Sequence, residues 1–166
     1  MAVERYSFRP ICWDGDSSDL PFLCELYAST RREEVSATGW PQEQIEAFLK
    51  QQFEAQHCHY QEHFSSADFE IIQGADGSDI GRLYLDEWEK EFRIIDIALL
   101  PDHRGKGIGS DILKKIIDRA FAVGKSLSIH VEQFNPAMKL YLRLGFQKLE
   151  EQGVYHLMEI RPSETQ

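Results

Sequence analysis

The sequence contains little cysteine and no long hydrophobic run. Its three cysteines are an odd number with neither paired nor metal-type spacing: Cys12, Cys24 and Cys58. We therefore expect reduced and mostly buried thiols rather than a disulfide framework. The most apolar stretch, residues 94–100, is too short to span a bilayer and is interrupted by Asp96. Residues 1–10 carry charges and no apolar signal-peptide core, so we expect a cytoplasmic protein.

Basic residues are scarce as well. The chain has 18 Lys and Arg against 28 Asp and Glu, a net charge of −10 at pH 7. An acidic surface repels the phosphates of nucleic acids and the anionic head groups of membranes, so we expect neither as a partner. Residues 102–125 are the exception, with six basic and three acidic side chains. A phosphate-bearing ligand would be attracted to this segment.

Histidine and cysteine cluster at residues 57–63, where His59 and His63 share one face of a predicted helix. No second pair of ligands at a suitable spacing completes a coordination shell nearby. We therefore expect no metal site.

The length of 166 residues fits one domain, which we place at residues 1–166. Apolar patterning predicts strands at 6–12, 69–73, 80–85, 92–100, 127–132, 146–150 and 154–160. Helical spacing predicts helices at 20–30, 41–64, 108–124 and 136–144, with a polar connection at 31–39. Hairpins make successive strands antiparallel, whereas the strand, helix and strand between residues 92 and 131 form a parallel βαβ unit. The predicted fold class is α/β (α+β), with a central mixed, mostly antiparallel sheet of about six or seven strands flanked by about four helices.

The most informative segment is residues 101–110, between an apolar strand and an amphipathic helix. Alternate residues from Gly105 to Gly109 are glycine, which removes side chains where the first unpaired N–H groups of the helix point outward. These groups and the positive end of the helix dipole form an anion site. A P-loop would need Ser or Thr after Lys106, and a dinucleotide fingerprint starting at residue 107 would need a small residue in place of Ile112. A nucleotide-phosphate enzyme is therefore only a secondary alternative.

Two motifs give this segment a more specific interpretation. The first, Arg-x-x-Gly-x-Gly, is filled by Arg104, Gly107 and Gly109. The second is Asn-Pro-Ala-Met-Lys-Leu-Tyr, followed by Leu-Gly-Phe, at residues 135–146. In both motifs and in their separation, the sequence resembles the GNAT acetyltransferase family over residues 69–160. The resemblance implies a single acyl-CoA N-acyltransferase domain. It would move the acetyl group of acetyl-CoA directly to a primary amine of a small molecule or peptide through a ternary complex.

The resemblance also implies roles for individual residues. In this family the central strand pairs with the pantetheine arm of the co-substrate, here along Ile97, Ala98 and Leu99. The phosphates would be held by backbone N–H groups of the glycine loop: Arg104, Gly105, Lys106, Gly107, Ile108, Gly109 and Ser110. Asn135 would contact the CoA arm, although it lies six residues before Tyr141 rather than the usual seven. Tyr141 would protonate the departing thiolate. It also lies on an apolar helical stripe, so a plain packing role is the alternative.

The general base is left open. Many relatives place Glu nine residues before the loop arginine, where this chain has Ile95. The remaining candidates are Asp96, Glu132, His130, Glu33 and Glu34. Strand alternation would send Asp96 to the opposite face from Ile95 unless a bulge intervenes.

Acidic and aromatic residues occupy the parts that usually shape the acceptor site in this family: Glu33, Glu34, Trp40, Asp86, Glu87, Trp88 and Glu89. This composition predicts a cationic amine as acceptor. A non-catalytic acyl-CoA-binding module is the alternative from another class, because the strand Glu is missing. Homodimers are common in the family, so the resemblance allows a homodimer.

Overall fold

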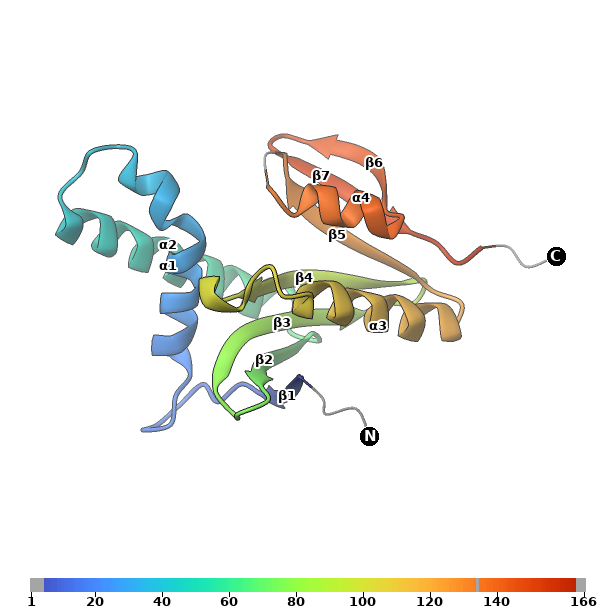
Figure 1. The fold of residues 1–166 in the computed structure, drawn as a ribbon, viewed down its shortest axis with the longest axis horizontal. Helices are drawn as coiled ribbons and strands as arrows, with labels where there is room; N and C mark the ends of the chain where they lie inside the picture. Colours follow the sequence, from blue (N-terminus) through green and yellow to red (C-terminus); the bar gives the residue numbers. More distant parts are fainter. Residues whose placement is uncertain (1–4, 134, 164–166) are drawn as a thin grey trace.

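The computed structural model describes residues 5–133 and 135–163. Within them, a seven-stranded sheet has the strand order β1-β2-β3-β4-β5-β7-β6 and is flanked by helices on both faces (Figure 1). The strands are β1 (Tyr6–Pro10), β2 (Asp68–Gly74), β3 (Asp79–Glu87), β4 (Glu91–Leu99), β5 (Ser126–Glu132), β6 (Gln147–Gln152) and β7 (Tyr155–Ile160). The α-helices are α1 (Leu20–Ser36), α2 (Gln42–His63), α3 (Ile108–Ala122) and α4 (Met138–Leu144), and a 3-10 turn, η1 (Pro101–His103), precedes α3.

The predicted elements are confirmed in kind and order, with one substantial correction. Helix α1 continues to Ser36, so most of the polar connection predicted at residues 31–39 is helical. Its charged side chains have partners along and across the helices. Arg32 pairs with Glu25 on its own helix and with Glu46 on α2. Polar residues of good helix propensity extend a helix beyond the end of its apolar stripe, and the stripe alone does not reveal this.

The sheet is mixed and mostly antiparallel, as predicted. Strand β4 runs parallel to β5, and the other neighbouring strands are antiparallel. The β4–β5 pairing covers only residues 91–94 of β4 and 126–129 of β5. Beyond that point the two strands separate, and Figure 1 shows β5 and β7 turning away from β4. We call the opening between residues 95–99 and 130–132 the wedge.

A β-bulge lies at the start of the wedge. Tyr84 on β3 is opposite Asp96, whereas the next residue, Leu85, is opposite Ile94. Ile95 is therefore an extra residue in β4, and it packs against the cluster that contains Tyr84. The bulge places Asp96 on the same face of the sheet as Ile95. There the Asp96 carboxylate accepts a hydrogen bond of 2.5 Å from Arg82 Nη2. Strand alternation alone predicted that Asp96 and Ile95 lie on opposite faces unless a bulge intervenes, and this bulge is present.

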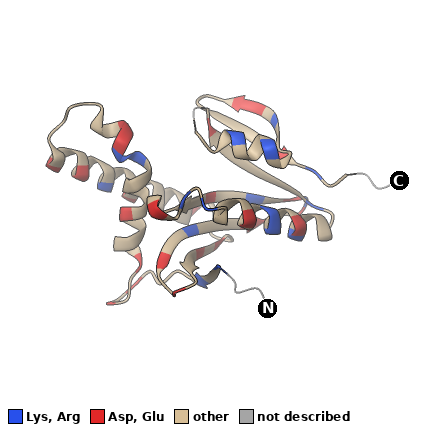
Figure 2. Ribbon diagram, in the orientation of Figure 1, with Lys and Arg blue, Asp and Glu red and all other residues tan. Residues whose placement is uncertain are grey.

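Two apolar clusters hold the helices on the sheet. Helices α3 and α4 pack on one face through residues such as Ile112, Ile116 and Tyr141. Helices α1 and α2 cover the other face through residues such as Leu23 and Phe53. Lys and Arg gather along α3 and the segment before it (Figure 2), as the charge count predicted. No helix in the described part of the chain is long and apolar enough to cross a membrane.

Candidate active site

The glycine loop ends in a bare helix N-terminus. Gly105 and Gly107 have φ angles of 72° and 85°, in the left-handed region that glycine adopts without strain. Gly107 caps α3 without any side-chain hydrogen bond, and its carbonyl accepts the N–H of Asp111 at 3.0 Å. The N–H groups of the first helical turn, from residue 108 to residue 110, therefore have no partner within the helix. These are the N–H groups at which the sequence predicts an anion site.

Gly109 is not required by the backbone or by packing. Its φ angle is outside the left-handed region, and a Cβ atom there would meet only Leu99 Cδ1, at 3.9 Å. An alanine would therefore fit the protein as it stands. The missing side chain instead leaves free space in front of the exposed N–H groups.

Arg104 braces the loop and does not offer its side chain freely. Its Nε donates to the carbonyl of Leu99 at 2.8 Å, and its Nη2 donates to Ser29 Oγ on α1 at 3.3 Å. Its own backbone N–H donates to Pro101 at 3.2 Å. The arginine of the motif thus ties the loop to the end of β4 and to α1.

The predicted strand segment has one open edge. Ile97, Ala98 and Leu99 pair with β3 on one side, while the pairing with β5 has already ended at Ile94. Backbone groups that point away from β3 therefore face the wedge. Asn135 lies near the start of α4, where its Oδ1 accepts the N–H of Ala137 at 2.8 Å.

Tyr141 is buried on α4, with 5% of its surface exposed, and packs edge-on against Phe146 with ring centroids 5.6 Å apart. Burial raises the pKa of its phenol, and the charge of Asp96 adds to this effect. The phenol therefore stays protonated at neutral pH. Asp96 also contributes, after burial, to the raised pKa of Tyr60 on α2. Arg82, which bonds the Asp96 carboxylate, also donates to Gln56 on α2 at 2.8 Å, so this carboxylate lies on the α2 side of the sheet.

The five candidate bases differ in their surroundings. Asp96 is paired with Arg82, whose side chain is only 3% exposed. Glu132 and Glu34 both pair with Arg31, at 2.5 and 3.2 Å. The fifth candidate, Glu33, is exposed on α1.

His130 differs from the carboxylates because one of its two ring nitrogens, Nδ1, is already hydrogen-bonded to Arg93. Its Nδ1 lies 3.1 Å from Arg93 Nη1 and must accept, since arginine has only donors. The ring proton is therefore on Nε2. Burial and the charge of Arg93 lower the pKa of His130, so the ring is neutral at pH 7. Because Nε2 carries the proton and Nδ1 accepts from Arg93, neither ring nitrogen is free to take a proton from the acceptor.

A hollow of about 560 Å³ lies between α2 and the sheet; we call it the sheet hollow. It is lined by Tyr27, Arg31, Gln52, Ala55, Gln56, His59, Tyr60, Phe64, Arg93, Ile94, Ile95, His130, Gln152 and Tyr155. Its floor is formed by β4 and β5 at the start of the wedge, and the hairpin of β6 and β7 contributes the last two residues. It therefore offers an acceptor access to the wedge from the α1 and α2 face.

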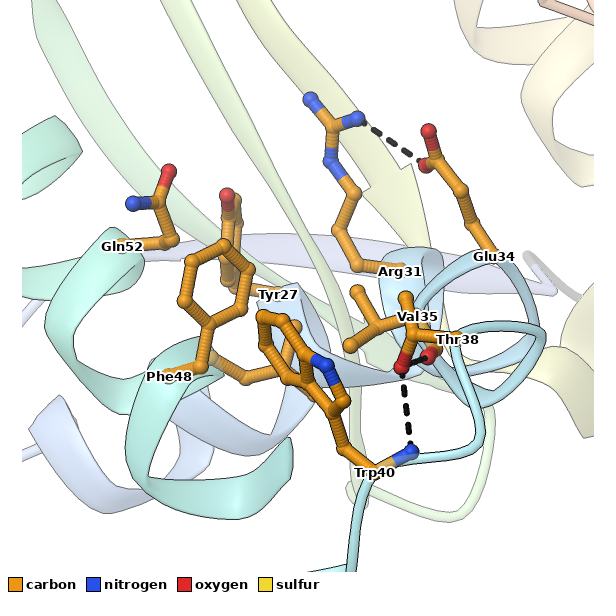
Figure 3. Close-up of a pocket in the computed structure, with 9 residues that line it drawn as sticks. Tyr27, Arg31, Glu34, Val35, Thr38, Trp40, Phe48 and Gln52 are labelled. Carbon is orange, nitrogen blue, oxygen red and sulfur yellow. Dashed lines mark hydrogen bonds and ion pairs between the residues drawn. The ribbon is translucent and has the colours of Figure 1, made fainter. Parts of the chain in front are cut away.

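A smaller hollow of about 310 Å³ adjoins it between α1 and α2 (Figure 3). Tyr27, Arg31 and Gln52 line both spaces. In Figure 3, Trp40 and Phe48 close one side, while Arg31 reaches toward Glu34 on the other.

The acidic and aromatic residues expected to shape one acceptor site are separated in the structure. Asp86 accepts hydrogen bonds from Ser66 and from Trp88 Nε1, and Glu87 pairs with Lys125 beyond the C-terminal end of α3. This hairpin lies at the end of β4 opposite the glycine loop. These contacts brace the β3–β4 hairpin, and the cationic acceptor expected from this composition stays a prediction.

The prediction of mostly buried thiols was also wrong. Cys12 and Cys58 are exposed, and Cys24 is half-buried. His59 and His63 stack with ring centroids 4.2 Å apart. Among the residues that the structure describes, no group of three or more His, Cys, Asp or Glu side chains could hold a metal ion.

Sequence reasoning missed most of the sheet hollow. Arg93 lies between Phe92 and Ile94 in an apolar strand, and such a charge inside an apolar run is a signal that could have been noticed. Tyr60, Gln56 and Tyr155 carried no signal of this kind. Gln56 and Tyr60 lie on α2 and Tyr155 on β7, so they meet only in the folded protein.

The comparisons with known proteins agree with this geometry. The bovine thialysine N-epsilon-acetyltransferase (Bos taurus) is 44% identical over 63 residues, which are 37% of this chain and 37% of that protein. The streptothricin acetyltransferase of Streptomyces lavendulae is 38% identical over 80 residues, or 46% and 42% of the two chains. The matched segments thus span less than half the length of these two curated relatives.

Similarity to solved structures extends over nearly the whole chain. The crystal structure of PaiA N-acetyltransferase from Thermoplasma acidophilum, in complex with coenzyme A, covers 95% of this chain and 99% of its own. The TM-score is 0.68 at 18% identity. At this identity the likeness concerns the fold. The sequence profile of the Acetyltransferase (GNAT) family matches residues 22–146, most of the chain. With its glycine loop, wedge and matching profile, the chain belongs to the GNAT acetyltransferase family.

Proposed function

We propose that this protein is an N-acetyltransferase that moves the acetyl group of acetyl-CoA directly to a primary amine through a ternary complex. The observation that carries the proposal is the wedge between β4 and β5, which joins a bare helix N-terminus to a buried tyrosine. Membership of the GNAT family supports the reaction class. The name of the bovine relative states transfer to an ε nitrogen, which supports an amine as acceptor.

The chain has the groups that acetyl-CoA requires. The N–H groups from Gly105 to Ser110 would hold the diphosphate at the positive end of α3. The open edge of β4 at Ile97–Leu99 would pair with the pantetheine amides as an added strand does. Asn135 uses its Oδ1 within the chain, so its amide N–H₂ group is available to donate to the CoA arm. Together these groups would direct the thioester into the wedge.

The transfer needs one proton donor and one exit for a proton. The free amine attacks the thioester carbonyl carbon, a C–N bond forms, and the C–S bond breaks. We assign the proton that the departing sulfur takes up to the Tyr141 hydroxyl, because burial keeps this phenol protonated. The nitrogen gives up one proton as the amide forms; this proton passes to water in the sheet hollow, and Tyr141 takes up one proton from water to regain its neutral form.

We further propose a cytoplasmic location. Two exposed cysteines and one half-buried cysteine, all free, suit a reducing compartment. A homodimer remains an expectation from the family, and size-exclusion chromatography with light scattering tests it.

Release of the CoA thiol from acetyl-CoA in the presence of an amine panel tests the proposal. We expect amine-dependent release, with the acetylated amine as product. A non-catalytic acyl-CoA-binding module would bind CoA in calorimetric titration and release no thiol. A nucleotide-phosphate enzyme would bind ATP at least as tightly as CoA. Either result would contradict the proposed reaction.

A further inference from the structure

The lining of the sheet hollow differs in charge from the protein as a whole. The chain carries a net charge of −10, yet none of the described residues that line the hollow is Asp or Glu. Two of them, Arg31 and Arg93, are cationic. A cation in this lining that no carboxylate of the protein neutralises would attract an anion and repel a simple polyamine.

The two arginines are not equivalent. Arg31 is neutralised by Glu132 at 2.5 Å and by Glu34 at 3.2 Å, and its pKa is raised as Glu132 offsets the effect of burial. Arg93 lies over the Trp88 ring, 4.7 Å from its centroid, and among the described residues it has only one longer ion pair, with Glu91 at 3.8 Å. Its Nε donates to Ser128 Oγ at 2.7 Å and its Nη1 to His130 Nδ1 at 3.1 Å, both uncharged acceptors.

The charge of Arg93 is only weakly compensated inside the protein. The carboxylate paired with it, Glu91, is 3.8 Å from Nη2 and already accepts a hydrogen bond from the Ser128 hydroxyl. The Arg93 side chain is 11% exposed, and burial lowers its pKa, opposite to the direction for Arg31. Among the described residues, Nη2 makes no hydrogen bond. Burying a cation without a close counter-ion costs free energy, and an anionic ligand would restore the balance.

We propose that the acceptor carries a carboxylate as well as the amine, and that Arg93 binds this carboxylate in the sheet hollow. The inference rests on the proposed function, and it replaces the purely cationic amine expected from composition. The planar guanidinium, held in orientation by Ser128 and His130, matches a carboxylate.

The position of Arg93 also sets the length of the acceptor. Arg93 precedes the wedge, and Asp96, a candidate base at the start of the wedge, is three residues further along β4. At the usual rise per strand residue this is roughly 10 Å. An amine at the end of a flexible chain, rather than one next to the carboxylate, would span this distance. A volume of about 560 Å³ suits a small molecule of this kind.

Lysine and cadaverine test the proposal because they differ only in the carboxylate and share the terminal amine. We expect kcat/KM of the wild-type protein to be about 10- to 100-fold higher for lysine, the range of a charge-assisted hydrogen bond. Equal use of the two amines, or preference for cadaverine, would overturn the carboxylate site and leave the acetyltransferase intact. This comparison needs no variant.

Single-residue variants show which side chain is responsible for the preference for lysine. Arg93→Gln should bring the lysine-to-cadaverine ratio to within about threefold while the KM for acetyl-CoA stays unchanged, and Arg93→Lys should retain part of the preference. Arg143→Gln is the matched control, because that arginine is exposed on α4, which packs on the other face of the sheet, and it should keep the wild-type ratio. An Arg93→Gln protein that keeps the full lysine preference would refute the assignment.

If no amine releases thiol, the proposed function fails and binding decides the inference separately. Lysine is then titrated calorimetrically into the protein saturated with CoA. Binding that Arg93→Gln abolishes and Arg143→Gln preserves would support the carboxylate site. Absent binding, or binding that ignores Arg93, would overturn it.

Discussion

Replacement of Gly109 by alanine should stabilise the fold. Gly109 is in the first turn of α3, its φ angle is outside the left-handed region, and a Cβ would make one ordinary contact, with Leu99 at 3.9 Å. Alanine restricts the unfolded chain without straining the folded one. This gain is about 0.4–1 kcal/mol, or roughly 1–4 °C in Tm for a domain of this size.

The same methyl group should weaken CoA binding. It would stand in front of the N–H groups that we assign to the diphosphate. Loss of one charge-assisted hydrogen bond costs about 1.5–3 kcal/mol, which raises the Kd for CoA about 10- to 100-fold. Gly109→Ala is therefore expected to be more stable and to bind more weakly, and general damage to the fold cannot produce this combination.

Thermal unfolding and calorimetric titration with CoA measure the two effects on one preparation. Gly124→Ala is the control, because Gly124 follows the opposite end of α3 and has a φ angle of 74°. It should lose about 1 kcal/mol of stability and keep its CoA affinity within twofold. Wild-type CoA affinity in Gly109→Ala would refute the assignment of the diphosphate to this turn.

Three further predictions test other parts of the account. Tyr141→Phe should lower kcat about 10²-fold or more and leave the Kd for CoA unchanged, as steady-state kinetics and titration would measure; unchanged turnover would make Tyr141 a packing residue. Asp19→Asn should cost about 1–2 kcal/mol at pH 7 in chemical denaturation, because the 7% exposed carboxylate accepts two hydrogen bonds of 2.8 Å from Arg9. Arg9 lowers the pKa of Asp19 below its ordinary 3.8, so this stability is present above that pH and is lost as the pH falls through the lowered pKa. The difference between Asp19→Asn and wild type should therefore shrink below about pH 4, and a constant difference would contradict the ion pair. Leu23→Ala, at a fully buried position between α1 and the sheet, should cost about 2–5 kcal/mol by the same assay, and a loss below 1 kcal/mol would contradict the packing described.

Local chemistry explains why the glycine loop could be predicted. The N–H groups of a helix start are exposed by the geometry of the helix itself, so Gly105, Gly107 and Gly109 indicate the site without any knowledge of the sheet. The order of strands and helices followed in the same way from the period of the apolar residues. The end of α1 could not be predicted from the apolar period, because Arg31 and Arg32 continue the helix through ion pairs rather than through an apolar stripe.

The rest of the site depends on pairings between distant segments. The bulge at Ile95 is a property of the register between β3 and β4, and one strand's sequence does not contain it. The sheet hollow needs two helices, the floor of the sheet and the β6–β7 hairpin to come together. Composition placed Asp86 and Trp88 in the acceptor site, whereas their hydrogen bond stabilises a hairpin elsewhere.

A crystal structure of the protein with CoA would test the central claim most directly. The account predicts the diphosphate within hydrogen-bond distance of the backbone N–H groups of Ile108, Gly109 and Ser110, with the pantetheine arm along the open edge of β4 and the sulfur near Tyr141. CoA bound away from the glycine loop, or a diphosphate held without these N–H groups, would contradict it.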